Sequence, residues 1–504
     1  MRRVFNKFIS LYLERRYKQI EYFMLHPIEV QERLFRELID QGLETSYGRS
    51  HGIDRVQDQS DYAKMIPLAT YDQLKPHIDR MMHGETDVLW PGKINWFSKS
   101  SGTTSDKSKF IPVSQTNLKN GHFKGSWDVV TLLYHNKPES QIFAEKNLVM
   151  GGALSKFTAH PETTYGDISA IMLENMPAIG RPFYTPDFET ALLPNWDEKI
   201  ERMVKICSKE NITMFGGVPT WTIVLFRKIP EYTGKSNILE VWPNVQTYVH
   251  GGVAFGPYRE QFKKFIPTDD FNYVEVYNAS EGYFAIQDDL GVNDMLLLLD
   301  NGNYYEFIPM SNFNDDNPKA ISLSDVKTGI NYALVVTTTS GLWRYQLGDT
   351  IMFTSTDPYK IRITGRTKHF INVFGEEIMV SNTDKALMLA CQESGATVAD
   401  YMVAPIFIAG DEGKGGHEWA IEFVQNPPDL EVFAKRLDLH LQSVNSDYEA
   451  KRYKDMALLQ IKVNAVPSGT FQKWMRQRGK VGGQNKVPRL SNERKYLEQI
   501  LTMT

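Results

Sequence analysis

The chain has 504 residues, of which 42% are hydrophobic, 12% aromatic and 23% charged. Such a composition is typical of a globular protein with a sizeable core, and the length predicts two or three domains. Lys and Arg total 56 against 61 Asp and Glu, so the net charge at pH 7 is −5. This mild acidity gives no reason to expect a nucleic-acid partner.

The cysteines and the start of the chain argue against several other classes. Cys207 and Cys391 lie far apart, so we predict neither a disulfide framework nor a zinc site. Residues 1–7 are basic, but charges within 14–18 interrupt any apolar run, so we expect neither a signal peptide nor a membrane span. A surface helix is expected here rather than one that associates with a membrane. We therefore expect a cytoplasmic protein without stable membrane insertion.

The first part of the chain, up to about Gly92, is expected to be largely helical. Apolar residues recur there at helical spacing, as at Phe5, Ile9 and Leu13. Further along, Thr70 is placed to cap a helix over 71–82. After a polar turn, a second long helical pattern runs over 115–134.

The middle of the chain repeats the order of strand, glycine and, in places, helix. Four segments have a β-rich run ending in glycine or a small polar turn: 147–152, 212–219, 244–253 and 272–281. This order predicts an α/β domain with a parallel sheet. From 295 to 353 the runs become short and β-rich, including 295–299, 304–308, 332–338 and 341–347. They suggest a β-barrel-like part or an antiparallel sheet appended to the α/β core.

A smaller unit is expected after Gly365-Arg366. Helices over 383–393 and 430–444 alternate with strands over 398–403, 419–424 and 457–463. This alternation predicts an α+β domain. The predicted fold class is therefore α/β, with a large domain over 1–365 and a smaller, mobile domain over 366–504 that a hinge joins to it.

The most informative polar stretch is Ser98 to Lys109, between predicted strands at 94–97 and 110–113. It combines serine and threonine hydroxyls, one glycine and three lysines. Such a turn can offer backbone N–H groups, hydroxyls and ammonium groups to a triphosphate. It matches neither the phosphate loop of Walker type nor the Gly-x-Gly-x-x-Gly turn, and a solvated hairpin turn is the alternative.

Three further features suit a nucleotide, although each has an ordinary alternative. Glu281 follows a predicted strand and could hold Mg²⁺ beside phosphate oxygens, or it could be a surface glutamate. Asp349 could accept both hydroxyls of a ribose, or belong to a Gly-Asp turn. Gly251-Gly252 would let a flat base approach the backbone, or form a tight turn.

In their order along the chain, these motifs resemble the adenylate-forming superfamily of acyl-CoA ligases, luciferases and peptide-synthetase adenylation domains. The corresponding segments are Ser101 to Thr104, Gly251 to Val253, Tyr277 to Glu281, Tyr345 to Asp349 and Gly365-Arg366. Within it, residues 100–104, 277–284 and 344–349 resemble the Gretchen Hagen family of acyl-acid amido synthetases, known from plant auxin and jasmonate conjugation. Segments 66–82, 242–244 and 482–489 extend this resemblance over nearly the whole chain.

The resemblance implies a two-step ligase that uses ATP and Mg²⁺. A carboxylic acid is activated as acyl-adenylate, and an amine, in this family usually an amino acid, then forms the amide and releases AMP. We expect a monomer or weak dimer. Two alternatives share the nucleotide motifs: an acyl-CoA ligase, and a nucleotide-binding protein that has kept the fold without turnover.

The resemblance also implies roles for individual residues. The expected ATP contacts are Ser100, Ser101, Gly102, Thr103, Thr104, Lys109, Gly251, Gly252, Val253, Tyr277, Ser280, Glu281, Tyr345, Asp349 and Arg366. Glu281 is expected to bind Mg²⁺ and Lys368 to act as the hinge. Lys486 is expected to be the catalytic lysine of the small domain, with Lys473 and Lys480 as alternatives.

Two positions depart from the superfamily pattern, and the acid pocket is less specified. Asp106 stands near a position where the superfamily loop usually has glycine, and the superfamily's usual Pro-Lys-Thr ending is absent at 467–470.

An apolar or aromatic acid is expected to bind among Phe123, Trp127, Val130, Val218, Pro219, Thr220 and Trp221. The alternative is that these aromatic residues belong to the core.

Overall fold

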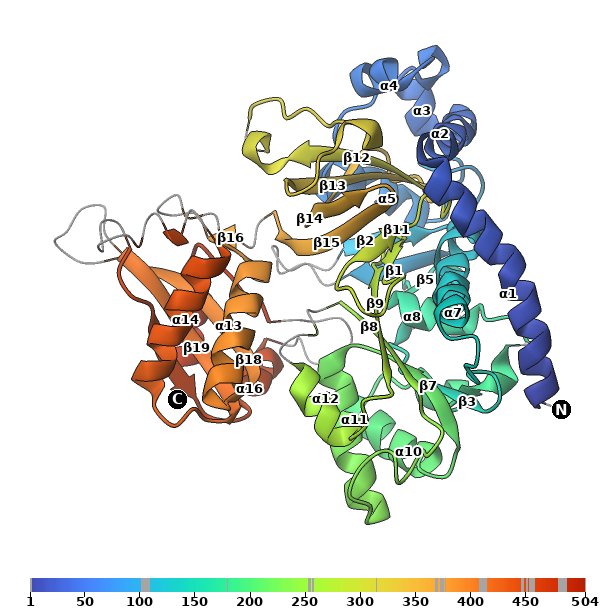
Figure 1. Ribbon diagram of the computed structural model, residues 1–504. Helices are drawn as coiled ribbons and strands as arrows, with labels where there is room; N and C mark the ends of the chain where they lie inside the picture. Colours follow the sequence, from blue (N-terminus) through green and yellow to red (C-terminus); the bar gives the residue numbers. More distant parts are fainter. Residues whose placement is uncertain are drawn as a thin grey trace. The chain divides into compact units, whose positions relative to one another are not determined.

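Figure 1 shows the computed structural model of the chain, whose colours run from blue at the N-terminus to red at the C-terminus. The structure describes residues 2–100, 109–178, 180–252, 255, 258–313, 315–367, 370–371, 376, 378–407, 415–445, 448–449, 452, 458–478 and 487–503; the side chains at 2–8, 10, 220 and 370 are outside this description. The chain divides into two compact units. The first comprises Met1–Val253, Phe265–Leu347 and Ile351–Arg362, and the second Ala254–Lys264, Gly348–Thr350 and Ile363–Thr504.

The first unit begins with helices, as predicted. They are α1 (Arg2–Leu25), α2 (Pro27–Leu43), α3 (Ser46–Ser50), the 3₁₀ turn η1 (Ile53–Arg55), α4 (Gln59–Met65) and α5 (Tyr71–Met82). The predicted helix over 71–82 is confirmed to the residue, and Thr70 caps it. The Thr70 N–H donates to Gln73 Oε1 at 2.7 Å, as in a capping box.

Most of the described strands of the first unit form one mixed sheet. Its order is β12-β13-β14-β15-β11-β10-β9-β8-β7-β3-β6, and its β6 to β9 part is parallel. These parallel strands are β3 (Lys146–Val149), β6 (Tyr184–Thr185), β7 (Ile212–Gly216), β8 (Thr247–Gly251) and β9 (Asn272–Asn278). The predicted parallel α/β core is thus confirmed.

The β-rich region that we expected to be barrel-like forms the antiparallel end of the same sheet. It contains β10 (Tyr283–Ile286), β11 (Met295–Leu297), β12 (Asn303–Pro309), β13 (Asn331–Thr338), β14 (Tyr345–Thr356) and β15 (Tyr359–Arg366). The antiparallel pairing of β10 with β9 joins it to the parallel strands. The strand predicted over 341–347 is wrong at its start, because Gly341 (φ 84°) and Arg344 (φ 42°) form a turn.

Helices and a second sheet surround this core. The sheet, in the order β2-β1-β5-β4, contains β1 (Trp96–Ser100), β2 (Lys109–Val113), β4 (Leu154–Lys156) and β5 (Thr164–Gly166). The helices and turns are α6 (Gln115–Asn117), η2 (Leu118–Phe123), α7 (Lys124–Asn136), α8 (Ile168–Glu174), η3 (Arg181–Phe183), α9 (Phe188–Ala191), α10 (Trp196–Cys207), α11 (Pro219–Thr233), α12 (Arg259–Phe265, shared by the two units), η5 (Met310–Asn312) and η6 (Leu323–Asp325). The helix expected over 115–134 is interrupted by η2, which is a π turn. Figure 1 shows α1 running alongside α7, and the two helices are in contact.

The second unit has the α+β character predicted for it. Its elements are β16 (Phe370–Ile371), β17 (Ile378–Met379), α13 (Val380–Ser394), β18 (Thr397–Phe407), β19 (Gly415–Gln425), α14 (Leu430–Val444), β20 (Lys462–Val466), α16 (Thr470–Gln477) and α17 (Lys495–Leu501). Tyr401, Trp419 and Phe433 lie in its buried core. The predicted strand over 457–463 is displaced, since β20 begins at Lys462. Among the residues described in both units, no helix is both long and apolar enough to cross a membrane.

Candidate functional site

Several predicted site residues lie outside the described residues. They are Ser101, Gly102, Thr103, Thr104, Val253, Lys368 and Lys486, with the alternative Lys480 and the side chain of Thr220. The remaining candidates fall into two groups, one in each compact unit, and each group is described by itself.

In the first unit, the predicted adenine and magnesium motifs follow neighbouring parallel strands. In the register of β8 with β9, Gly251 pairs with Val276. A Cβ at Gly251 would collide with the Val276 carbonyl oxygen, so glycine is required for this close approach. Ligands of open α/β sheets bind at the carboxyl ends of their strands, and both motifs are at such ends.

The segment from Tyr277 to Glu281 is well buried. Glu281 is 7% exposed, and Ser280 Oγ is buried without a hydrogen-bond partner among the described residues. The turn closes through the N–H of Ala279, which donates to the Gly282 carbonyl oxygen at 2.9 Å. The motif therefore combines a carboxylate with an unsatisfied hydroxyl at the end of β9.

The π turn η2 contacts Asn278 within this segment, and α7 contacts Tyr283 just after it. His122, in the π turn η2, lies with Nδ1 3.3 Å from Asn278 Oδ1. On α7, a Cβ at Gly125 would collide with the Tyr283 ring, so the bare helix backbone packs against that ring. His122 is completely buried, and burial lowers its pKa from the usual 6.5 to about 4. Its imidazole is therefore neutral at physiological pH.

The β1–β2 hairpin holds the two ends of the predicted phosphate loop. Its antiparallel register runs from the pair Trp96–Val113 to the pair Ser100–Lys109. Lys109 Nζ donates to Tyr345 Oη at 3.3 Å and lies 5.6 Å from the Tyr71 ring centroid. The structure thus brings together Lys109 and Tyr345, two predicted ATP contacts that are 236 residues apart.

Sequence reasoning missed the residues that support this contact. Tyr71 Oη accepts the N–H of Phe110 at 2.8 Å. Arg344 is buried and donates Nε and Nη2 to Glu306 at 2.8–3.1 Å. Its Nη1 donates to the carbonyl oxygens of Ala63 and Ile66. The sequence also gives no sign of the left-handed φ at Arg344, because residues other than glycine seldom adopt that conformation.

In the second unit, the two residues expected to hold the ribose form an ion pair. Arg366 Nε lies 2.9 Å from Asp349 Oδ1. The N–H of Thr367 donates to the Gly348 carbonyl oxygen at 2.9 Å, which ties the two backbone segments together. A diol would therefore meet a carboxylate and a guanidinium that are already aligned with each other.

The residues predicted for the acid pocket have aromatic neighbours in two places. Trp127, which is 44% exposed, stacks on Phe143 with ring centroids 5.9 Å apart. Trp221 lies against Trp196 at 4.1 Å. Phe123 packs beside the small apolar cluster of Val113 and Leu118, and Val130 is buried. A cavity of about 550 Å³ between α1 and α2 is lined by none of the seven predicted residues.

The side chains present suit the triphosphate and Mg²⁺ that the family resemblance implies. Lys109 supplies a cation, Ser280 an unsatisfied hydroxyl and Glu281 a carboxylate. In the part of the chain that the structure describes, no three His, Cys, Asp or Glu side chains gather as a metal site. One carboxylate that leaves the other positions to phosphate oxygens and water is the arrangement Mg²⁺ commonly adopts.

Comparisons with solved structures show the same fold. The GH3.15 acyl acid amido synthetase matches with a TM-score of 0.76 at 16% identity, over 97% of this chain and 95% of that chain. A 2-hydroxyisobutyryl-CoA ligase in complex with 2-HIB-AMP matches with a TM-score of 0.60 at 14% identity, over 94% and 92%. The predicted fold class is therefore confirmed.

Sequence comparisons identify the family. Indole-3-acetic acid-amido synthetase GH3.3 of Arabidopsis thaliana is 23% identical over 541 residues, which cover 91% of this chain and 89% of the relative. Jasmonoyl-L-amino acid synthetase JAR4 of Nicotiana attenuata is 23% identical over 517 residues, covering 88% and 87%. The GH3 family N-terminal domain matches residues 16–195 and 157–271, the central domain 296–366 and the C-terminal domain 381–495. The chain belongs to the GH3 (Gretchen Hagen) family.

Proposed function

We propose that this protein is an ATP-dependent acyl-acid amido synthetase, which joins a carboxylic acid to an amine, in particular to an amino acid. The observation that carries the proposal is the position of Gly251 and of Tyr277 to Glu281 at the ends of neighbouring parallel strands. The named activities of relatives support the same chemistry. They include an indole-3-acetic acid-amido synthetase and a jasmonoyl-L-amino acid synthetase, each covering most of this chain.

In the first proposed step, a carboxylate oxygen of the acid attacks the α-phosphorus of ATP. A new P–O bond forms, the bond to the bridging oxygen breaks, and pyrophosphate leaves. In the second step, the amine nitrogen attacks the carbonyl carbon of the acyl-adenylate. The C–N bond forms, AMP leaves as the anion, and the amine releases a proton to solvent or a base.

The side chains of the first unit are suited to the charge changes of the first step. Lys109 and the hydroxyl of Ser100 are proposed to bind phosphate oxygens, where fixed donors stabilise developing negative charge. Mg²⁺, held by Glu281, would screen the repulsion between the acid and the triphosphate. Tyr277, Ser280 and Tyr345 are proposed to flank the nucleotide beside Gly251-Gly252.

In the second unit, Asp349 and Arg366 are proposed to hold the ribose, and Lys486 to stabilise the adenylation transition state. We further propose that the domains divide at residue 365, with the hinge at Lys368. The seven residues from Phe123 to Trp221 remain the proposed lining for the acid. A cytoplasmic location suits a reaction that consumes ATP.

Pyrophosphate release tests the proposal directly. Purified protein is incubated with ATP, Mg²⁺ and a panel of aryl, indolyl and fatty acids, with pooled amino acids or with coenzyme A. We expect acid-dependent pyrophosphate release and an amide product that appears only with amino acids. Glu281→Ala should abolish both. A thioester product with coenzyme A would favour the acyl-CoA ligase, and nucleotide binding without turnover across the panel would favour a non-catalytic binder.

A further inference from the structure

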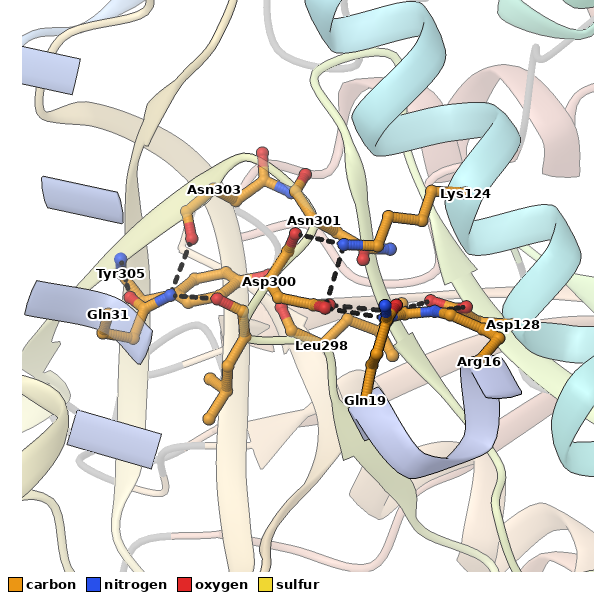
Figure 2. Close-up of polar contacts among 11 residues, drawn as sticks. Arg16, Gln19, Gln31, Lys124, Asp128, Leu298, Asp300, Asn301, Asn303 and Tyr305 are labelled. Carbon is orange, nitrogen blue, oxygen red and sulfur yellow. Dashed lines mark hydrogen bonds and ion pairs between the residues drawn. The ribbon is translucent and has the colours of Figure 1, made fainter. Parts of the chain in front are cut away.

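The inference starts from Arg16 of α1, whose guanidinium bridges two carboxylates that are far apart in the sequence. Arg16 Nε and Nη2 donate to Asp128 at 2.7 and 2.9 Å, and Nη1 and Nη2 donate to Asp300 at 2.8 and 2.9 Å. Figure 2 shows the guanidinium between the two carboxylates. Both pairs are bidentate, which is the strongest geometry for arginine with a carboxylate.

The inner part of this network is buried, whereas Lys124 and Asp300 also line the cavity between α1 and α2. The side chain of Asp128 is fully buried and that of Arg16 is 11% exposed. Burial raises the pKa of Asp128, and the hydrogen bonds from Arg16 act against that effect. Burial would also raise the pKa of Asp300, but Arg16 and Lys124 outweigh it and lower that pKa. Arg16 therefore offsets the cost of burying charge at both carboxylates, fully at Asp300 and in part at Asp128.

Lys124 extends the network along α7. Its Nζ donates to the carbonyl oxygen of Asp300 at 2.8 Å and lies 2.9 Å from Asp300 Oδ2. In Figure 2, Lys124 and Asp128 both project from α7 toward the turn that carries Asp300. Arg16 and Lys124 together tie three separate segments: α1, α7 and the turn between β11 and β12.

Two of these segments contact the ends of the proposed nucleotide segment. The backbone of α7 at Gly125 packs on Tyr283, and His122 just before α7 lies beside Asn278. Directly after the turn, at the start of β12, Asn303 Nδ2 donates to the carbonyl oxygens of Tyr283 at 3.3 Å and of Asn301 at 3.1 Å. η2, α7 and the start of β12 therefore contact Asn278 and Tyr283, on the two sides of the turn that carries Ser280 and Glu281.

We infer that Arg16 is a positioning residue for the segment from Tyr277 to Glu281, because it fixes the two elements that pack against Asn278 and Tyr283. Arg16 acts through these elements and is not itself a catalytic residue. The effect on turnover rests on the proposed function, whereas the effect on the segment itself does not.

Arg16→Lys is the central variant. Lysine keeps the positive charge, but one ammonium group cannot bond bidentately to two carboxylates. We expect the Mg²⁺ concentration for half-maximal pyrophosphate release to rise and the adenylation rate to fall by about 10²-fold, which is the effect of a small misplacement of reacting groups. Asp300→Asn, which loses the ion pairs to Arg16 and Lys124, should act in the same direction.

Ile20→Ala and Arg15→Lys are the matched controls. Ile20 is fully buried on the same helix, so its truncation destabilises α1 without removing an ion pair. Arg15 is the exposed neighbour of Arg16. Both controls should keep the wild-type Mg²⁺ dependence, although Ile20→Ala should lower the melting temperature.

Amide hydrogen exchange supplies a measurement that is independent of turnover. We expect exchange in 277–283 to become at least about tenfold faster in Arg16→Lys than in Ile20→Ala, since a loosened segment opens more often. Wild-type exchange there and wild-type Mg²⁺ dependence, with only a lower melting temperature, would overturn the inference. If the wild-type protein releases no pyrophosphate, the proposed function fails and hydrogen exchange alone decides this inference.

Discussion

Burial of His122 should make the free energy of unfolding depend on pH through this one side chain. Its buried imidazole has a pKa of about 4, against a usual value of 6.5. Between these values the unfolded chain binds a proton that the folded protein does not, so the free energy of unfolding falls as the pH decreases from 6.5 to 4. At about 1.4 kcal/mol per pKa unit, the loss amounts to about 3 kcal/mol.

His122→Gln tests this assignment, because glutamine can still bond to Asn278 but does not titrate. Urea unfolding at pH 4.5, 5.5 and 7 should show a smaller pH dependence of stability for the variant than for the wild type. His83→Gln, at an exposed position, is the control and should follow the wild type. If stability depended on pH equally in His122→Gln and in the wild type, the dependence would have to arise from another group.

Lys109 is the described cation that we propose for phosphate binding. Lys109→Met removes the charge and keeps much of the side-chain length, so adenylation should slow by about 10² to 10³-fold, as when a single oxyanion donor is lost. Lys93→Met, at an exposed lysine whose ammonium pairs with Glu162, should leave the rate unchanged. Pyrophosphate release under saturating acid measures both. An unaffected Lys109→Met enzyme would remove this residue from the proposed site.

For individual residues, the sequence indicates candidate site residues but not the side chains that they contact. Lys109, Glu281 and Asp349 could be predicted because their motifs occur in a recognisable order. The contacts of Arg16 with Asp128 and Asp300 could not, because they join positions 112 and 284 residues apart. Nothing local in the sequence distinguishes such an arginine from an exposed one.

Among the elements, the start of β14 depends on a buried ion pair that reaches past β13 to β12. Arg344 immediately precedes Tyr345 and is held by Glu306 of β12. Glu306→Ala would leave the guanidinium buried without its carboxylate, and we expect a loss of about 3–5 kcal/mol in the free energy of unfolding. Adenylation should also weaken, because the left-handed turn at Arg344 aims Tyr345.

The exposed pair of Lys75 and Asp79 provides the control for Glu306→Ala. Asp79→Ala removes an ion pair between half-exposed side chains and should change stability by less than about 1 kcal/mol. Denaturant unfolding of the two variants measures the difference. Similar losses for both would mean that burial of the Arg344 pair contributes little.

Helices could be predicted from periodicity more accurately than the strand ends. The helix over 71–82 has a regular apolar face and a capping threonine, so its bounds were predictable. The apolar residues of 341–347 look like a strand, but the backbone turns at Gly341 and Arg344 before β14 begins. Hydrophobic pattern alone does not reveal a positive φ at an arginine.

For the whole molecule, the order of motifs and the alternation of elements were enough to predict the α/β fold and the family. The placement of individual catalytic groups in the small domain depends on the resemblance alone. Lys486 is assigned in that way, and Lys473 and Lys480 are the alternatives. Periodicity and composition cannot separate three lysines in one basic region.

Alanine substitution of each of these lysines tests which one is catalytic. Lys486→Ala should slow acid-dependent pyrophosphate release by about 10² to 10³-fold, since it removes a cation from the transition state. Release of AMP from a preformed acyl-adenylate should change less, because attack at the α-phosphorus and departure of pyrophosphate belong to the first step only. Lys473→Ala and Lys480→Ala should both behave as wild type. A reversed ranking would transfer the catalytic role to one of them.

The π turn η2 fixes the rotational phase of α7. It accommodates one residue more than an α-helical turn, and each residue of a helix advances the side-chain direction by about 100°. A deletion of a single residue within 118–123 that let the helix become continuous would turn α7 about its axis. Asp128 would then face away from Arg16, and Gly125 would be replaced opposite Tyr283 by a residue with a side chain. Relatives of this chain should therefore tolerate length changes in surface loops but keep the residue count between the β1–β2 hairpin and α7.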